Sequence, residues 1–99
     1  MTPEGKTKAK IKAMLKKYNV YYAMPMGTGF GNSGVPDFLC CMNGFFLGIE
    51  AKAGKGKTTA LQNKNLDSIV TAGGMALVVN EDSMEYLEAK LKELKERMV

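Results

Sequence analysis

Residues 34–52, GVPDFLCCMNGFFLGIEAK, carry the strongest structural signal in the sequence. This stretch contains two apolar runs rich in β-forming residues, and the dipeptide Asn43-Gly44 separates them. Asn-Gly between two such runs is the strongest short-range signal for a hairpin closed by a two-residue type I′ turn. We therefore predict two antiparallel strands, over 36–42 and 45–52, in which the residues on either side of the turn pair with each other.

Three charged residues, Asp37, Glu50 and Lys52, interrupt this apolar hairpin. Counting outward from the turn places Asp37 directly opposite Glu50, with Cβ atoms about 4.5–5.5 Å apart on one face of the sheet. Lys52 lies two residues beyond Glu50 and therefore shares that face. Two carboxylates about 5 Å apart repel by roughly 3 kcal/mol at an effective dielectric constant near 20. Because a divalent cation between them removes this repulsion, the register predicts a metal site.

Carboxylate oxygens at this separation suit Mg²⁺, which binds one or two carboxylates and leaves its other positions to water and substrate phosphate. Such an ion lowers the pKa of bound water and stabilises the charge that develops on a phosphodiester. An ammonium group beside the ion, here that of Lys52, can orient the water or the phosphate oxygens. The alternative is structural, with Asp37 in reach of solvent at the strand entry and Glu50 simply paired with Lys52.

The sequence on either side of the hairpin predicts further elements with local start and stop signals. A helix over 3–18 begins at Thr2-Pro3, and VYYAMP (20–25) is a short strand that precedes the glycine-rich loop MGTGFGNSG (26–34). We expect this loop to be mobile and to lie on the substrate side. After the hairpin come a helix within 59–74, the strand MALVV (75–79) and an amphipathic helix within 81–98.

The apolar spacing of the last two helices predicts which residues face the core. In the helix within 59–74, the inward positions are Leu61, Asn65 or Leu66, Ile69 and Val70, and Gly73-Gly74 ends the helix. In the last helix they are Met84, Leu87, Leu91 and Leu94. The predicted fold class is α/β, one domain over 1–99 with the order α-β-β-β-α-β-α and a mixed sheet flanked by helices.

The net charge of +4 is distributed unevenly along the chain. Residues 1–17 hold six lysines against one acid, residues 52–64 hold four lysines and no acid, and residues 81–97 hold six acids against four bases. Two basic segments that flank the hairpin predict a face for a polyanion. The candidate DNA contacts are Lys6, Lys10, Lys55 and Lys57. On charge alone, a solvated helix surface explains the lysines equally well.

Composition excludes several other classes of protein. The sequence shows no apolar run near eighteen residues and no secretion signal, so we expect no membrane association and a cytosolic location. The adjacent Cys40 and Cys41 have no CxxC spacing, and the chain contains no histidine. We therefore interpret both cysteines as buried small apolar residues rather than as metal or redox groups.

The residues PD, followed after a hairpin by EAK, resemble the PD-(D/E)XK nuclease superfamily, whose restriction-endonuclease-like core has the order α-β-β-β-α-β. The more specific GVPD, IEAK and glutamine in the next helix are similar to the VRR-NUC (virus-type replication-repair nuclease) family, in a stand-alone form that spans essentially the whole chain. The resemblance implies that Asp37 and Glu50 bind Mg²⁺ or Mn²⁺, that Lys52 and Gln62 belong to the catalytic site, and that Glu4 adds a metal carboxylate.

The same resemblance implies a function: a metal-dependent, structure-selective DNA endonuclease in the cytoplasm of a bacterial or phage-infected host cell. Stand-alone members of the family resemble junction-resolving enzymes. Branched DNA such as a Holliday junction is therefore the expected substrate, and a symmetric homodimer the expected assembly.

Two of the implied residues also have local explanations. Gln62 follows Thr59 by three positions, which is the spacing of a capping box. Glu4 falls in the first turn of a helix, where any carboxylate is stabilised by the helix dipole. The sequence leaves both roles open.

Two other functions compete with the nuclease. AKAGKGKT (51–58) matches a relaxed Walker A pattern, and ALVVNED later mimics a Walker B strand, which suggests a P-loop nucleotide-binding protein. That interpretation leaves Asp37 and Glu50 unexplained, and 99 residues are few for such a domain. The second competitor is a non-catalytic nucleic-acid-binding module, which would not need the carboxylate pair and would not nick DNA with a divalent cation.

Overall fold

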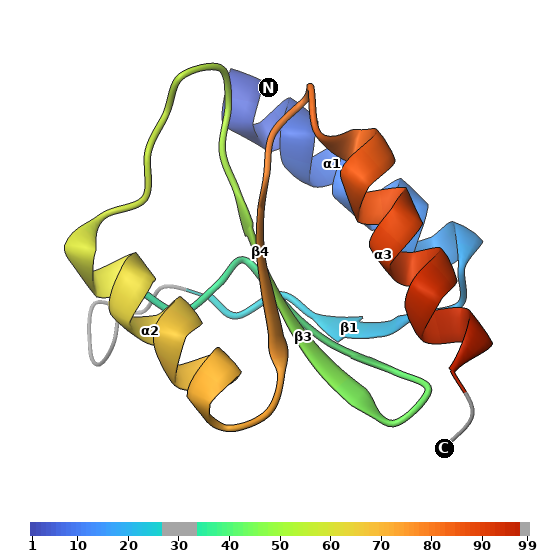
Figure 1. The fold of residues 1–99 in the computed structure, drawn as a ribbon. Coiled ribbons are helices and arrows are strands. Elements are labelled where there is room, and N and C mark those ends of the chain that lie inside the picture. The colour runs from blue at the N-terminus through green and yellow to red at the C-terminus, as the bar shows by residue number, and fades with distance from the viewer. Residues whose placement is uncertain (27–33, 98–99) are drawn as a thin grey trace.

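The structure is a computed structural model that describes residues 1–26 and 34–97, and it confirms the α/β class. Within these residues the elements follow the predicted order (Figure 1): α1 (Pro3–Lys17), β1 (Tyr21–Ala23), β2 (Phe38–Met42), β3 (Phe45–Ala51), α2 (Ala60–Thr71), β4 (Met75–Val79) and α3 (Met84–Glu96). Most of the glycine-rich loop, for which we predicted mobility and a place near substrate, lies outside the described residues.

The hairpin of β2 and β3 has the predicted register. Asn43 and Gly44 have φ angles of 52° and 85°, as a type I′ turn requires, and Met42 pairs with Phe45. The ladder ends at the pair Phe38 and Ile49, so β2 begins two residues later than predicted. Residue 37 therefore lies at the mouth of the hairpin and not inside the ladder.

The four strands form one mixed sheet in the order β1-β2-β3-β4. The pairs β1–β2 and β2–β3 are antiparallel. The pair β3–β4 is parallel, and α2 connects its two strands. Figure 1 shows α1 and α3 packed side by side on one face of the sheet and α2 on the other. β3 thus contacts α1 on one face of the sheet and α2 on the other.

The main hydrophobic core lies between the sheet and the pair α1 and α3. From β3 it receives the alternate residues Leu47, Ile49 and Ala51, all fully buried. From α3 it receives Leu87, Leu91 and Leu94, with Met84 packed at the margin, which confirms the predicted inward face of that helix. Because side chains alternate along a strand, Gly48 and Glu50 face the opposite side, toward α2.

The face toward α2 is covered less completely than predicted. The helix buries Leu66, but Leu61 and Val70 are 41% and 57% exposed, so placing them in the core was wrong. Cys40 is buried as expected, whereas Cys41 is exposed, which corrects the prediction for that residue. The reason is that α2 contacts β3 and β4 and leaves the outer face of β2 open.

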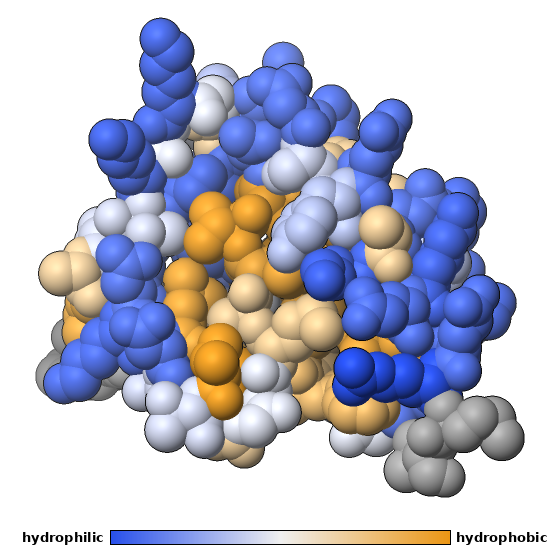
Figure 2. Space-filling view, viewed as in Figure 1, coloured by the Kyte–Doolittle hydropathy of each residue, from blue (hydrophilic) through white to orange (hydrophobic). Residues whose placement is uncertain are grey.

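A space-filling view shows the consequence for the surface. Apolar residues gather along β4, the edge strand, between the hydrophilic outer surfaces of α2 and α3 (Figure 2). Val78 of this strand is 44% exposed. In the part of the chain that the structure describes, no helix combines the length and the apolar character needed to cross a bilayer.

Candidate active site

Asp37 and Glu50 meet at the open end of the hairpin, as the register predicted. Glu50 is the second-last residue of β3 and is 3% exposed. Asp37 precedes β2, and its Oδ2 accepts a hydrogen bond of 2.8 Å from the backbone N–H of Ala51. The carboxylate of Asp37 thus continues the pairing where the backbone ladder has ended, and this bond fixes it beside Glu50.

Burial and crowding make the Glu50 carboxylate unfavourable to ionise. Removal from water, which has the largest effect, the charge of Asp37 and a hydrogen bond between the two carboxyl groups together raise the pKa of Glu50 to about 7. The ammonium group of Lys52 acts in the opposite direction. The electrostatic conflict predicted from the sequence is therefore present in the metal-free protein.

Lys52 lies among the carboxylates of Asp37, Glu50 and Glu4, which together form the acidic cluster. Its Nζ is 3.7 Å from Glu50 Oε2 and 3.9 Å from Glu4 Oε1, and its side chain is 13% exposed. The backbone N–H of Lys52 donates to the carbonyl of Val79 at 2.9 Å, which extends the pairing of β3 with β4 by one residue. The backbone hydrogen bond thus fixes the position of residue 52, and the two carboxylates hold its ammonium group.

Gln62 completes the predicted capping box and also contacts Glu50, whereas its catalytic role stays a prediction. Its Oε1 accepts from the backbone N–H of Thr59 at 2.9 Å, and the Thr59 hydroxyl accepts from the N–H of Gln62 at 3.1 Å, so the capping box is complete. Its Nε2 donates to Glu50 Oε2 at 3.2 Å. The N-terminus of α2 therefore holds the buried carboxylate in place through Gln62.

The first turns of α1 supply two more charged groups. Glu4 reaches Lys52, as described above, and Lys8, one turn later, lies with its Nζ 3.4 Å from Asp37 Oδ1. We did not predict Lys8 from the sequence. A signal was present, since Lys8 precedes the buried Ile11 by three residues and therefore lies on the side of α1 that faces the sheet.

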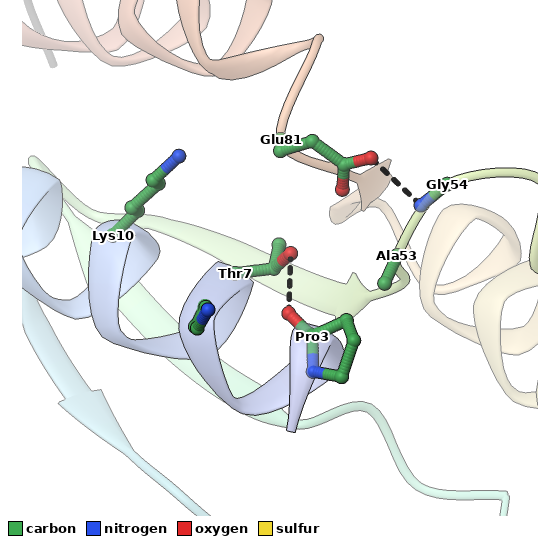
Figure 3. A pocket seen from close by; sticks show the side chains of 7 residues that line it. Pro3, Thr7, Lys10, Ala53, Gly54 and Glu81 are labelled. Carbon is green, nitrogen blue, oxygen red and sulfur yellow. Dashed lines mark hydrogen bonds between the residues drawn. The ribbon is translucent and has the colours of Figure 1, made fainter. Parts of the chain in front are cut away.

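Lys6 and Lys10 lie on a different side of α1. They line a groove of about 530 Å³ together with Thr7, Gly54 and Glu81, in which Glu81 accepts from the N–H of Gly54 at 2.8 Å (Figure 3). Positions two residues apart on a helix are rotated by about 200° about its axis. Lys6 and Lys10 therefore lie on nearly the opposite side of α1 from Glu4 and Lys8.

Lys55 and Lys57 are exposed in the loop that follows Lys52. This loop leads directly from the acidic cluster to the N-terminus of α2. DNA contacts by these two residues, and by Lys6 and Lys10, stay predictions.

The residues at this site fit a magnesium or manganese ion. Asp37 and Glu50 offer hard oxygen ligands from adjacent positions, and each carboxylate oxygen can accept more than one partner. Within residues 1–26 and 34–97, no group of three or more acidic, cysteine or histidine side chains is placed to hold a metal. Two protein carboxylates, with the other positions left to water and phosphate, are what Mg²⁺ commonly uses. Glu4 as a third ligand stays a prediction.

The helix that follows the loop resembling a Walker A motif is capped by its own side chains. A P-loop places phosphate on free backbone N–H groups at the start of the following helix. Here the side chains of Thr59 and Gln62 already satisfy the N–H groups of residues 62 and 59. This geometry favours a capped structural helix over a nucleotide site.

Comparison with known proteins adds no assignment: no protein family matches the chain, and no curated protein matches it. The likeness of GVPD, IEAK and Gln62 to the VRR-NUC family therefore stays a prediction. Function has to be argued from the arrangement of the side chains.

Proposed function

We propose that the protein is a divalent-metal-dependent DNA endonuclease. The observation that carries the proposal is the buried Glu50 carboxylate, placed beside Asp37 and Lys52 at the open end of the hairpin and held there by Gln62. A pair of carboxylates with a confined lysine suits a cation and a phosphodiester. The element order also agrees with a PD-(D/E)XK core, and we infer that the sheet is such a core.

Each side chain has a distinct task in this proposal. Asp37 and Glu50 hold the metal, which when bound acidifies water and stabilises negative charge on the phosphate. Gln62 orients Glu50 through its amide. Lys52, held between Glu50 and Glu4, presents its ammonium group to a phosphate oxygen or to the attacking water, and it stabilises the charge that develops as the phosphodiester breaks.

Nucleic acid is the proposed substrate because the site lies between two basic segments. Residues 1–17 and 52–64 both contribute to the acidic cluster and both carry excess lysine. Such segments attract the phosphate backbone irrespective of sequence. Branched DNA and a homodimer complete the proposal, since the family resemblance implies both and two copies of a 99-residue chain can share one substrate.

A non-catalytic DNA-binding module is the second candidate, because the basic segments alone are enough for binding. The raised pKa of Glu50 disfavours it. A module that only binds a polyanion gains nothing from two adjacent carboxylates, one of which is buried.

The decisive experiment is a cleavage assay on labelled duplexes, flaps, splayed arms and four-way junctions with Mg²⁺, with Mn²⁺ and with EDTA. We expect metal-dependent cuts in branched DNA, no cuts in EDTA, and none with Glu50→Gln, which keeps the shape of the side chain. DNA binding without cleavage under all metal conditions would identify the binding module instead. ATP hydrolysis without DNA cleavage would identify the P-loop protein.

The basic loop after β3 allows a separate test of the DNA surface. We expect Lys55→Ala with Lys57→Ala to weaken DNA binding and to reduce the slope of log affinity against log salt by up to about two charges. The matched control is Lys92→Ala with Lys95→Ala on the acidic helix α3, which makes the same change in net charge. Equal slopes in the two double variants would show that the loop points away from DNA.

A further inference from the structure

The acidic cluster contains a second lysine with no assigned task. Lys8 Nζ lies 3.4 Å from Asp37 Oδ1, whereas the other oxygen, Oδ2, accepts the N–H of Ala51. Lys8 therefore covers the oxygen of Asp37 that the backbone leaves available. Because Oδ1 accepts no backbone hydrogen bond from the described residues, we assign to it the contact with a cation.

The two lysines of the cluster are held very differently. Lys52 is 13% exposed, contacts both Glu50 and Glu4, and follows β3 directly. Lys8 is 35% exposed and extends from α1 to a single carboxylate. Lysine side chains are long and flexible, so Lys8 can leave Asp37 without disturbing the sheet, and Lys52 cannot move as freely.

We propose that Lys8 occupies the cation position at Asp37 in the metal-free protein and binds the substrate phosphodiester once a divalent cation has taken that position. This inference rests on the proposed nuclease function and adds a residue to it. Lys8 thus becomes a phosphate ligand that is available only when the metal site is filled.

The charge balance of the cluster supports the exchange. When ionised, Asp37, Glu50 and Glu4 contribute three negative charges, and Lys8 and Lys52 contribute two positive ones. The metal-free cluster therefore carries one net negative charge, which repels a phosphate. A divalent cation reverses the sign to one net positive charge, which matches the single negative charge of a phosphodiester. Without Lys8 the metal-loaded cluster would be neutral, and this attraction would be lost.

The competing explanation is that Lys8 and Asp37 form an ordinary ion pair that only stabilises the fold. Such a pair would have no effect on DNA once a metal is bound. The two explanations predict different effects of Lys8. A lysine that the metal displaces weakens metal binding and strengthens DNA binding when metal is present. A structural ion pair changes neither affinity specifically.

The test compares Lys8→Met, which keeps an unbranched side chain without the charge, with Lys16→Met as the matched control. Lys16 lies on the same helix about 12 Å further along its axis and is exposed. Calorimetric titration with Mn²⁺ in the absence of DNA should show about two- to fivefold tighter binding for Lys8→Met than for Lys16→Met, because no ion pair has to be broken. Thermal melting of both variants verifies that they fold.

DNA binding is then measured with the single variants on junction DNA whose backbone near the branch is a non-hydrolysable, singly charged phosphodiester analogue, so that Lys52 keeps its charge in the cluster. With Mn²⁺ present, we expect Lys8→Met to bind junction DNA about tenfold more weakly than Lys16→Met, with a salt slope smaller by about one charge. In EDTA the two variants should bind equally. Lys8→Arg, which keeps the charge, should restore both DNA and metal affinities to those of the parent.

Equal Mn²⁺ affinity and equal metal-dependent DNA affinity for Lys8→Met and Lys16→Met would overturn the inference. So would a Lys8→Arg protein that binds DNA no better than Lys8→Met. If the wild type still cuts DNA in either case, the nuclease proposal stands and only the role of Lys8 is wrong. If the wild type neither binds Mn²⁺ nor cuts DNA, the proposed function itself fails.

Discussion

The two ends of the hairpin formed by β2 and β3 have opposite characters. At the closed end, Asn43 and Gly44 adopt the backbone angles that their turn requires, and the Asn43 amide donates to the carbonyl of Leu94 at 3.0 Å. At the open end, Glu50 is buried beside another carboxylate, and its pKa is raised to about 7. The polar groups of the turn are hydrogen-bonded, whereas the two carboxylates at the open end repel each other.

In this small sheet, the residues that fix the structure and the candidate site lie at different ends of one hairpin. The turn fixes the register, and the register decides which side chains face each other several residues away. The same ladder that is well satisfied at the turn therefore forces Asp37 and Glu50 together at the mouth. Conflicts of this kind concentrate at functional sites, where a ligand relieves them.

The largest effect on activity is expected at the open end, from Lys52→Ala. We expect cleavage to fall by about 10²- to 10³-fold, because the variant removes the ammonium group that faces the reacting phosphate. DNA affinity measured in EDTA should change little, since Lys52 then pairs with Glu50 and Glu4. Single-turnover cleavage and fluorescence anisotropy measure the two quantities separately.

Lys57→Ala is the control for that variant, because it removes an equal charge from an exposed position in the adjacent loop. Cleavage at saturating DNA should be close to wild type. If Lys52→Ala cuts as fast as Lys57→Ala, Lys52 has no catalytic task, and the open end is not the active site.

The sequence predicted this end of the molecule well because local rules decide it. A two-residue turn allows one register, so Asn43-Gly44 was enough to place Glu50 opposite residue 37. The lysine two residues after Glu50 then had to share its face. The start of β2 was predicted too early because Asp37 bonds the backbone of Ala51 through its side chain, which no strand propensity reveals.

The free energy of unfolding should depend on pH through Glu50 at the open end of the hairpin. The pKa of Glu50 is about 7 in the folded protein, against an ordinary value of 4.5. Between these values the folded state retains a proton that the unfolded state has lost, so the contribution of Glu50 to metal-free stability should be greatest below pH 4.5 and be lost as pH rises through about 7. Glu50→Gln should abolish that decline and be more stable above pH 7, by on the order of 2 kcal/mol.

Urea denaturation in EDTA at several pH values measures this difference directly. Mg²⁺ should stabilise the wild type at high pH and stabilise Glu50→Gln much less, since the site exists only in the folded state. Asp37→Asn should gain less stability than Glu50→Gln, because it also weakens the ion pair with Lys8. A wild type whose stability is constant over the pH range would mean that Glu50 is not strained.

Parts of the site that depend on packing between elements could not be predicted in the same way. Six lysines in residues 1–17 are equivalent in composition, and only the rotation of α1 on the sheet brings Lys8 to Asp37. The exposed Cys41 has a similar cause, since its strand is apolar but no helix covers that face. Gln62 shows that two predicted roles, capping and site, can belong to one side chain.

The smallest expected effect tests the closed end. Asn43 has a left-handed φ of 52° and a hydrogen bond to the last turn of α3. Asn43→Gly keeps the φ angle accessible and removes the hydrogen bonds from the amide to the carbonyls of Leu94 and Arg97, so we expect a loss of about 1 kcal/mol. Asn43→Ala also loses the tolerance of asparagine for the left-handed region, which adds about 1 kcal/mol. Denaturation midpoints rank the two, and cleavage by both folded variants should match wild type. If either variant lost cleavage while still folded, the two ends of the hairpin would not be independent, and the turn would have to be counted as part of the site.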